Sequence, residues 1–196
     1  MSSDEPFCLG RRDVLGATAS GVAFSVFLPA GADAADSQGT RVDLGIYPEK
    51  RIARLSELSE GEPIAFTYPL EEQPNMLVKL GEKALRGIGP DEDIIAYSSL
   101  CTHMGGSLRG RYRHDLKALG PCPFHFSVFD LKKGGIPVHA SATQNLPQIV
   151  LKQDGDDIVA VGVLGLIYGF RNNLADGTLA EGAEPGSAKA PAIMRG

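Results

Sequence analysis

Two cysteine and histidine pairs in the middle of the chain restrict its fold more than any other feature of the sequence. Cys101 is followed by His103 and Cys122 by His125, with 18 residues between the two pairs. Each pair offers one thiol and one imidazole from a short stretch, and the intervening segment is long enough to fold back. The pairs therefore predict two neighbouring loops whose four side chains converge.

Three kinds of site are compatible with these two cysteines and two histidines. A disulfide between Cys101 and Cys122 explains the cysteines of an exported protein, but it leaves a histidine unexplained at close spacing to each of them. A zinc site accepts the same ligand types, although familiar structural zinc sites pair cysteine with cysteine and histidine with histidine. A [2Fe-2S] cluster bound by two thiolates and two imidazoles takes one of each from every loop, which is the order found here.

The residues around the two pairs resemble those of a known family. C-T-H-M-G-G at 101–106 and C-P-F-H-F-S at 122–127 resemble the two cluster-binding boxes of Rieske proteins. F-D-L-K-K-G-G from Phe129 resembles the strand and turn after the second box, and A-T-Q-N-L-P-Q-I-V-L from Ala142 resembles the loop, here with Pro147, that covers the cluster. The resemblance implies an all-β fold with a Rieske-type antiparallel β base domain and a small cluster-binding subdomain.

The resemblance also implies one Rieske-type [2Fe-2S] cluster and its ligands. Cys101 and Cys122 would bind one iron, and His103 and His125 would bind the other. Neutral imidazoles in place of two thiolates leave the oxidised cluster uncharged instead of doubly negative, so it accepts an electron more easily. Rieske potentials are accordingly about −150 to +300 mV, against roughly −400 mV for all-cysteine plant-type clusters.

Positions next to the ligands differ from those of Rieske proteins in respiratory complexes. Those proteins carry a second cysteine in each box, and the two form a disulfide, whereas this chain has Gly106 and Phe124 there. Ser127 is kept where the family places a hydroxyl donor to a bridging sulfide, but Phe129 stands where a tyrosine often donates to a cysteine sulfur. Because such donors stabilise the reduced, more negative state, the loss of one predicts a potential in the middle of the Rieske range.

A finer resemblance points to one branch of the family. Phe126 replaces the usual glycine of the second box, and H-F-S with N-L-P-Q-I-V-L and V-G-V-L-G-L-I-Y-G resembles the small subunit of bacterial arsenite oxidase. This implies a large molybdopterin subunit that carries a [3Fe-4S] cluster and oxidises arsenite. It also implies a periplasmic cytochrome c or an azurin-like blue copper protein as electron acceptor. The present chain would relay electrons between these partners and would have no catalytic residue of its own.

Other functions of such a chain stay open. The nearest alternative is the small subunit of a related molybdoenzyme such as iodate reductase, because the small subunit does not touch the substrate. A subunit of a quinol-oxidising respiratory complex predicts the missing disulfide and a retained anchor, and a ferredoxin of a ring-hydroxylating dioxygenase predicts a cytoplasmic chain. A structural zinc-binding adaptor is the alternative outside redox chemistry. The net charge of −5, without a basic stripe, argues against nucleic acid as a partner.

The N-terminal segment resembles a twin-arginine signal peptide. Arg11 and Arg12 precede an uncharged run at 14–28, and small residues follow at Ala32 and Ala34. The run is shorter than the roughly 20 residues that span a bilayer, so we expect cleavage after Ala34 and a periplasmic protein. A retained anchor is the alternative, and the chain contacts a membrane only in that case.

Composition and periodicity predict the organisation of the chain. We expect a signal peptide at 1–34, a Rieske domain at 41–170 with its cluster-binding subdomain at about 98–147, and a C-terminal extension at 171–196. The extension is either a tail or an arm that contacts a partner subunit. Alternating or β-branched apolar residues predict strands at 42–47, 63–68, 75–81, 93–98, 148–153 and 158–169. Segment 52–58 is a candidate for a short helix, or for a loop that leads into a strand.

Histidines and arginines outside the boxes are expected to have no role in the site. His114 and His139 lie in polar stretches that predict solvated loops. Arg109, Arg111 and Arg113 are similarly expected on a solvated charged loop. Contact of these arginines with a negative partner surface is the alternative.

Overall fold

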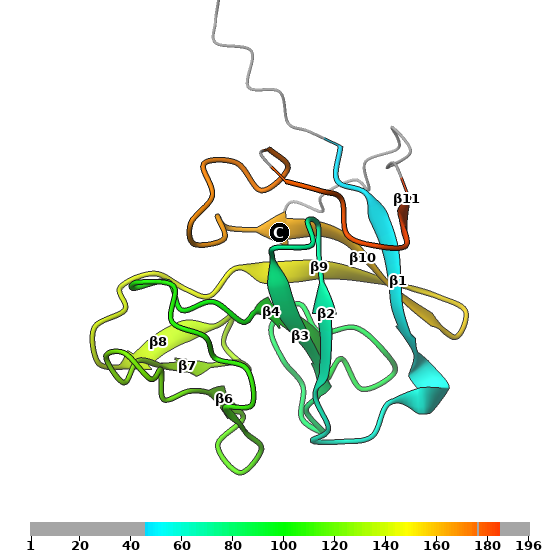
Figure 1. Cartoon of the computed structure of the whole chain (residues 1–196). Coiled ribbons are helices and arrows are strands. Elements are labelled where there is room, and N and C mark those ends of the chain that lie inside the picture. The colour runs from blue at the N-terminus through cyan, green and yellow to red at the C-terminus, as the bar shows by residue number, and fades with distance from the viewer. Residues whose placement is uncertain (1–45, 176, 185–196) are drawn as a thin grey trace, which may run out of the picture. The chain divides into compact units, whose positions relative to one another are not determined.

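The computed structural model describes residues 46–175 and 177–184, and this part of the chain consists mainly of β-strands and loops (Figure 1). The strands form two antiparallel sheets, and the only helical segment in the described ranges is a short 3₁₀ turn. The elements are β1 (Glu49–Arg54), η1 (Leu55–Glu57), β2 (Ile64–Thr67), β3 (Pro74–Lys79), β4 (Ile94–Ser98), β5 (Tyr112–Arg113), β6 (Ala118–Leu119), β7 (Val128–Asp130), β8 (Ile136–His139), β9 (Gln148–Asp154), β10 (Asp157–Leu164) and β11 (Ala183–Glu184). The predicted all-β class is confirmed.

The larger sheet forms the base domain. Its seven strands have the order β11-β1-β10-β9-β4-β3-β2. β9 and β10 form the predicted hairpin, and Gly155, with a φ of +59°, lies in the short turn between them. The sheet curls round, since the ammonium group of Lys50 on β1 donates a hydrogen bond of 2.9 Å to the carbonyl of Thr67 on β2.

Strands β3 and β4 lie between two hydrophobic cores. Leu77 and Ala96 belong to one core, which they share with residues of β1, β9 and β10. Their neighbours Val78 and Tyr97 belong to the second core, which also contains residues of the smaller sheet. Successive side chains of a strand point to opposite faces, so the two central strands need apolar residues at nearly every position.

The smaller sheet, β5-β6-β7-β8, packs on the second core. Leu119 on β6 and Phe129 on β7 are almost completely buried in it. The Tyr97 hydroxyl on β4 donates a hydrogen bond of 3.0 Å to the carbonyl of Leu131, which follows β7. Burial raises the pKa of Tyr97 well above its ordinary value, so the hydroxyl remains a donor that joins the two sheets.

Replacing Tyr97 with phenylalanine is expected to lower the free energy of unfolding by about 1–2 kcal/mol, because the buried carbonyl of Leu131 loses this donor. Urea unfolding followed by circular dichroism measures the change. Tyr112→Phe is the control, since the Tyr112 hydroxyl lies at the surface, 3.2 Å from Nδ1 of His114. We expect the control to change stability by less than about 0.5 kcal/mol. Equal effects of the two changes would contradict the importance of the bond to Leu131.

Most predicted strands are found. The segments 63–68 and 93–98 contain β2 and β4, and the segment 75–81 overlaps β3, which begins one residue earlier. The C-terminal hairpin is formed by β9 and β10, which ends at Leu164. The segment 42–47 lies mostly outside the described residues. The helix considered at 52–58 is corrected: its first residues belong to β1, and only Leu55–Glu57 forms a 3₁₀ turn. Pairing with β10 gives these residues backbone partners that outweigh a weak local helix preference.

The described part of the C-terminal extension lies on the base domain of the chain itself. Leu179 forms a bridge with Leu70, Ala180 is buried, and β11 pairs with β1. Residues 185–196, like the predicted signal peptide at 1–34, lie outside the described residues. Within residues 46–175 and 177–184, no helix has the length and apolar character that crossing a membrane requires.

Candidate metal centre

The first loop, 101–106, follows β4 and is closed by two backbone hydrogen bonds. The N–H of Cys101 donates to the carbonyl of Gly106 at 2.9 Å, and the N–H of Gly105 donates to the carbonyl of Cys101 at 2.8 Å. Gly105 has a φ of +68°, in the left-handed region that glycine enters without steric cost. The main chain therefore determines where Cys101 and His103 point.

The second loop, 122–127, precedes β7 and has the same backbone frame. The N–H of Cys122 donates to the carbonyl of Ser127, and the N–H of Phe126 donates to the carbonyl of Cys122, both at 2.9 Å. Phe126 takes the place that Gly105 has in the first loop, and its φ of +60° is also left-handed. This conformation costs a residue with a Cβ about 1–2 kcal/mol, which explains why glycine is usual at this position of the box.

Replacing Phe126 with glycine is expected to raise the free energy of unfolding by up to about 1 kcal/mol. Glycine removes the left-handed strain, and the greater freedom of glycine in the unfolded chain offsets part of the gain. Little buried surface is lost, because Phe126 is 63% exposed. Phe126→Ala retains a Cβ and therefore the strain, so it serves as the matched control. Urea unfolding that shows the same gain for alanine would refute the role of backbone strain.

The loops bring the four predicted ligands together as two pairs. Cys101 and Cys122 are buried free thiols, and they lie close enough for Cys122 to raise the pKa of the Cys101 thiol. The Nδ1 atoms of His103 and His125 lie 3.1 Å apart, and the two rings meet edge to face with their centroids 4.6 Å apart. His125 is exposed and His103 partly exposed, while both thiols belong to the second core. The imidazoles therefore lie toward solvent and the thiols toward the interior.

This arrangement fits a [2Fe-2S] cluster with two thiolate and two imidazole ligands. Imidazole nitrogens bind metal ions at about 2 Å, so Nδ1 atoms 3.1 Å apart can reach the same iron. The adjacent thiols can reach a second iron. Within the described residues, no group of three or more His, Cys, Asp or Glu side chains is placed to hold one metal ion. The side chains thus form one imidazole pair and one thiol pair, which is the arrangement that the two irons of a Rieske cluster need.

Burial also affects the chemistry of the thiol pair. It raises the pKa of the Cys101 thiol, and the contact with Cys122 raises this pKa further. Hydrogen bonds from the backbone N–H groups of His103 and Met104 act in the opposite direction. Because metal binding releases the thiol proton, the same N–H groups would stabilise the thiolate once it is a ligand.

The two positions that lack the extra cysteines lie next to each other. A Cβ placed on Gly106 would be 3.1 Å from Cδ2 of Phe124 and 2.6 Å from Sγ of Cys122. The Phe124 ring therefore packs beside Gly106. A side chain at position 106 would therefore require Cys122 or the Phe124 ring to shift from the positions they have here.

The other predicted residues near the ligands support the loops. The buried Ser127 hydroxyl accepts a hydrogen bond of 3.0 Å from the N–H of Ala142, and its own proton is left to donate. Phe129 is completely buried in the second core. The carbonyl of Pro147 accepts a hydrogen bond of 2.9 Å from the N–H of Ser98. This bond fixes the loop 142–147, which we call the proline loop, to the end of β4.

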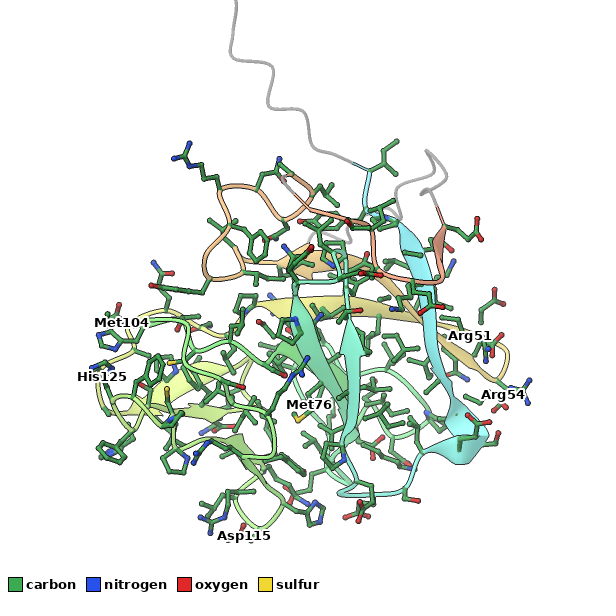
Figure 2. All side chains as sticks on the ribbon, in the orientation of Figure 1. Arg51, Arg54, Met76, Met104, Asp115 and His125 are labelled. Carbon is green, nitrogen blue, oxygen red and sulfur yellow. The ribbon has the colours of Figure 1, made fainter. Side chains whose placement is uncertain are left out.

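Exposed apolar side chains surround the histidine pair. Met104 in the first loop and Phe124 and Phe126 in the second are each more than half exposed. Figure 2 shows Met104 and His125 at the edge of the molecule formed by the small subdomain, far from Arg51 and Arg54. Neighbouring apolar side chains at a surface are typical of a contact with another protein.

The remaining polar residues stay outside the site. His114 belongs to a separate polar group, in which its Nε2 lies 3.3 Å from Oε1 of Glu60. His139 is exposed on β8. The structure adds two residues that the sequence does not single out, Thr102 and Tyr168, which contact the proline loop and the first cluster loop respectively. Both lie in segments quoted above for the resemblance, but their contacts are with distant parts of the chain, which no local motif indicates.

Comparison with known proteins agrees with this geometry. The family model of the Rieske [2Fe-2S] domain matches residues 49–153. Iodate reductase subunit IdrB of Denitromonas iodatirespirans is 45% identical over 171 residues, which are 87% of this chain and 90% of the relative. The corresponding subunit of Pseudomonas sp. (strain SCT) is 46% identical over 168 residues, 85% of either chain.

A solved structure shows the same fold. The soluble domain of the Rieske protein II (soxF) from Sulfolobus acidocaldarius matches with a TM-score of 0.57 and 25% identity, over 68% of this chain and 85% of that chain. The family model, the sequence relatives and the structural relative thus all point to the same kind of domain. The chain belongs to the Rieske [2Fe-2S] domain family and carries one Rieske-type [2Fe-2S] cluster.

Proposed function

We propose that Cys101, His103, Cys122 and His125 bind the cluster, and that the chain is the electron-transfer subunit of an iodate reductase. The observation that carries the proposal is an identity of 45% and 46% to two iodate reductase subunits along most of their length. The paired side chains support the ligand assignment, because thiols contact thiols and imidazoles contact imidazoles.

The exposed surface at His103 and His125, which we call the histidine edge, is the expected place of electron exchange. When bound, a Rieske cluster takes up and releases one electron at a time. Binding through the facing Nδ1 atoms leaves Nε2 of His103 and of His125 free to hold a proton or to bond to a partner. The exposed side chains of Met104, Phe124 and Phe126 frame this edge and suit a protein contact.

The proposed partner is a large molybdopterin subunit with a [3Fe-4S] cluster, which would contain the substrate site. In an iodate reductase electrons flow toward this subunit, so a cytochrome c or azurin-like protein would act as donor. We further propose that the complex is periplasmic and that a signal with Arg11 and Arg12 directs its export by the twin-arginine route.

Arsenite oxidase, the function predicted first from the sequence, has narrower support. Its resemblance rests on short motifs such as H-F-S at 125–127, whereas the identity to iodate reductase subunits extends over most of the chain. We therefore favour the alternative named with it. The direction of electron flow distinguishes the two enzymes, because arsenite donates electrons and iodate accepts them.

Electron paramagnetic resonance of the native complex with its large subunit tests the proposal. The complex is reduced with dithionite, freed of excess reductant and mixed anaerobically with iodate, and we expect the signal of the reduced Rieske cluster to disappear. A second, oxidised sample is mixed with arsenite, and we expect no signal. If the signal persists with iodate and appears with arsenite, the proposal of an iodate reductase is wrong and arsenite oxidase is the function. No Rieske signal after dithionite would contradict the ligand assignment.

A further inference from the structure

The segment 165–173, which we call the strap, leaves the end of β10 and contacts the first cluster loop. A Cβ placed on Gly105 would lie 2.5 Å from Cδ1 and 2.7 Å from Cε1 of Tyr168. Such distances are shorter than any that a real Cβ makes, so the Tyr168 ring packs directly on the backbone of Gly105. The contact is made by ring carbon atoms.

A buried amide anchors the strap to the base domain. Oδ1 of Asn173 accepts a hydrogen bond of 2.9 Å from the N–H of Ile167, and its Nδ2 donates one of 2.9 Å to the carbonyl of Gly165. Nδ2 also lies 3.1 Å from the Tyr47 hydroxyl, and the Gln73 side chain donates to the Asn173 carbonyl at 3.2 Å. Asn173 is only 5% exposed, and its hydrogen bonds join the two ends of the strap and connect the strap to Tyr47 and Gln73.

The strap also meets the proline loop. Thr102, Gln144 and strap residues 166–170 line a small cavity of about 160 Å³. The Thr102 hydroxyl donates a hydrogen bond of 2.8 Å to the carbonyl of Gln144. Thr102 lies between the two ligands of the first loop, so this loop is held by the proline loop on one side and by the Tyr168 ring on another.

We propose that Tyr168 is a positioning residue, which holds the first cluster loop in place where respiratory Rieske proteins use a disulfide. Gly106 and Phe124 cannot form that covalent link. The ring instead limits movement of Gly105, whose N–H closes the loop on Cys101. The inference rests on the ligand assignment proposed above, and it does not depend on the partner or its substrate.

The test is the rate at which the full chain with its cluster loses iron to an excess of an iron chelator. Loss is followed by the visible absorbance of the oxidised protein. Loss of the aromatic contact in Tyr168→Ala is expected to accelerate the release roughly three- to tenfold. Tyr168→Phe keeps the ring and is expected to behave like the wild type. Leu164→Ala, at a half-exposed apolar residue at the end of β10, is the matched control and should not accelerate the loss.

Two further readouts separate positioning from general destabilisation. The reduced Tyr168→Ala protein should show broader electron paramagnetic resonance lines, while its midpoint of urea unfolding should equal that of Leu164→Ala. The methyl group added by Gly105→Ala meets the Tyr168 ring. This change should therefore accelerate iron loss more in the wild-type chain than in the Tyr168→Ala variant, because the two positions are in contact.

The outcomes distinguish this inference from the proposal on which it rests. A wild-type chain that binds no cluster would overturn the ligand assignment and the inference together. Normal iron loss in Tyr168→Ala, with the cluster present, would overturn the inference alone. Fast loss in both Tyr168→Ala and Tyr168→Phe would also overturn it, because the ring would then not be the supporting group.

Discussion

Replacing His125 with cysteine is expected to lower the reduction potential of the cluster by on the order of 200 mV while iron stays bound. The substitution exchanges a neutral imidazole for a thiolate and makes the cluster more negative by one charge. Ranges of about −150 to +300 mV for Rieske clusters and roughly −400 mV for all-cysteine clusters place a mixed cluster between them. A spectroscopic redox titration of the full chain measures the shift.

The control for this change is His139→Cys. His139 is exposed on β8 and lies outside the two cluster loops, so the same chemical replacement should leave the potential within experimental error. An unchanged potential in His125→Cys would show that His125 is not a ligand. The wild-type value tests the prediction made from Phe129, and a potential near the upper limit of the Rieske range would refute the expected middle value.

Replacing Gly106 with alanine is expected to reduce the iron and acid-labile sulfide bound per chain several-fold. The added Cβ would lie 2.6 Å from Sγ of Cys122, a proposed ligand, so either this sulfur or the first loop must move. Metal–ligand distances in well-formed sites stay within about 0.2 Å of their typical values, so a thiol displaced by the added methyl group would be a poorer ligand. Iron and sulfide assays of the purified chain, with its visible spectrum, measure the loss.

The matched control is Gly162→Ala. Gly162 lies on β10 in the base domain, and a Cβ there would meet Val150 at 3.6 Å, an ordinary van der Waals distance. This variant should bind a full complement of iron. If Gly106→Ala also binds a full complement with an unchanged spectrum, the steric requirement at position 106 is wrong, and the glycine must be explained in another way.

The four candidate ligands could be predicted from the sequence because each pair lies within a few residues of the chain. A loop of six residues determines the geometry of its own ligands, as the closing bonds from Cys101 and Cys122 show. The longer strands could also be predicted from the sequence, since β3, β4 and β9 contain enough apolar residues to indicate that they are buried. The backbone conformation of Phe126 could be predicted as well. Rieske boxes usually have glycine at this position, which indicates a left-handed backbone there.

Other features depend on contacts between distant segments. Tyr168 contacts Gly105, and Asn173 contacts Tyr47 and Gln73. No local pattern indicates these contacts. β5 and β6 have two residues each, which is too few for a periodicity. The helix considered at 52–58 failed because its residues pair with β10, which follows about a hundred positions later. The structure of these segments depends on contacts with distant parts of the chain, which a local sequence pattern does not show.

The common frame of the two loops has a consequence for how such proteins can change. In both loops the closing bonds join a cysteine to the residues four and five positions later, yet the histidine follows the cysteine by two positions in one loop and by three in the other. The frame consists of main-chain bonds and therefore does not specify which side chains occupy the positions between them. Ligand identity can therefore vary while the backbone frame stays the same, so point substitutions can change the redox range of such a centre without a new fold.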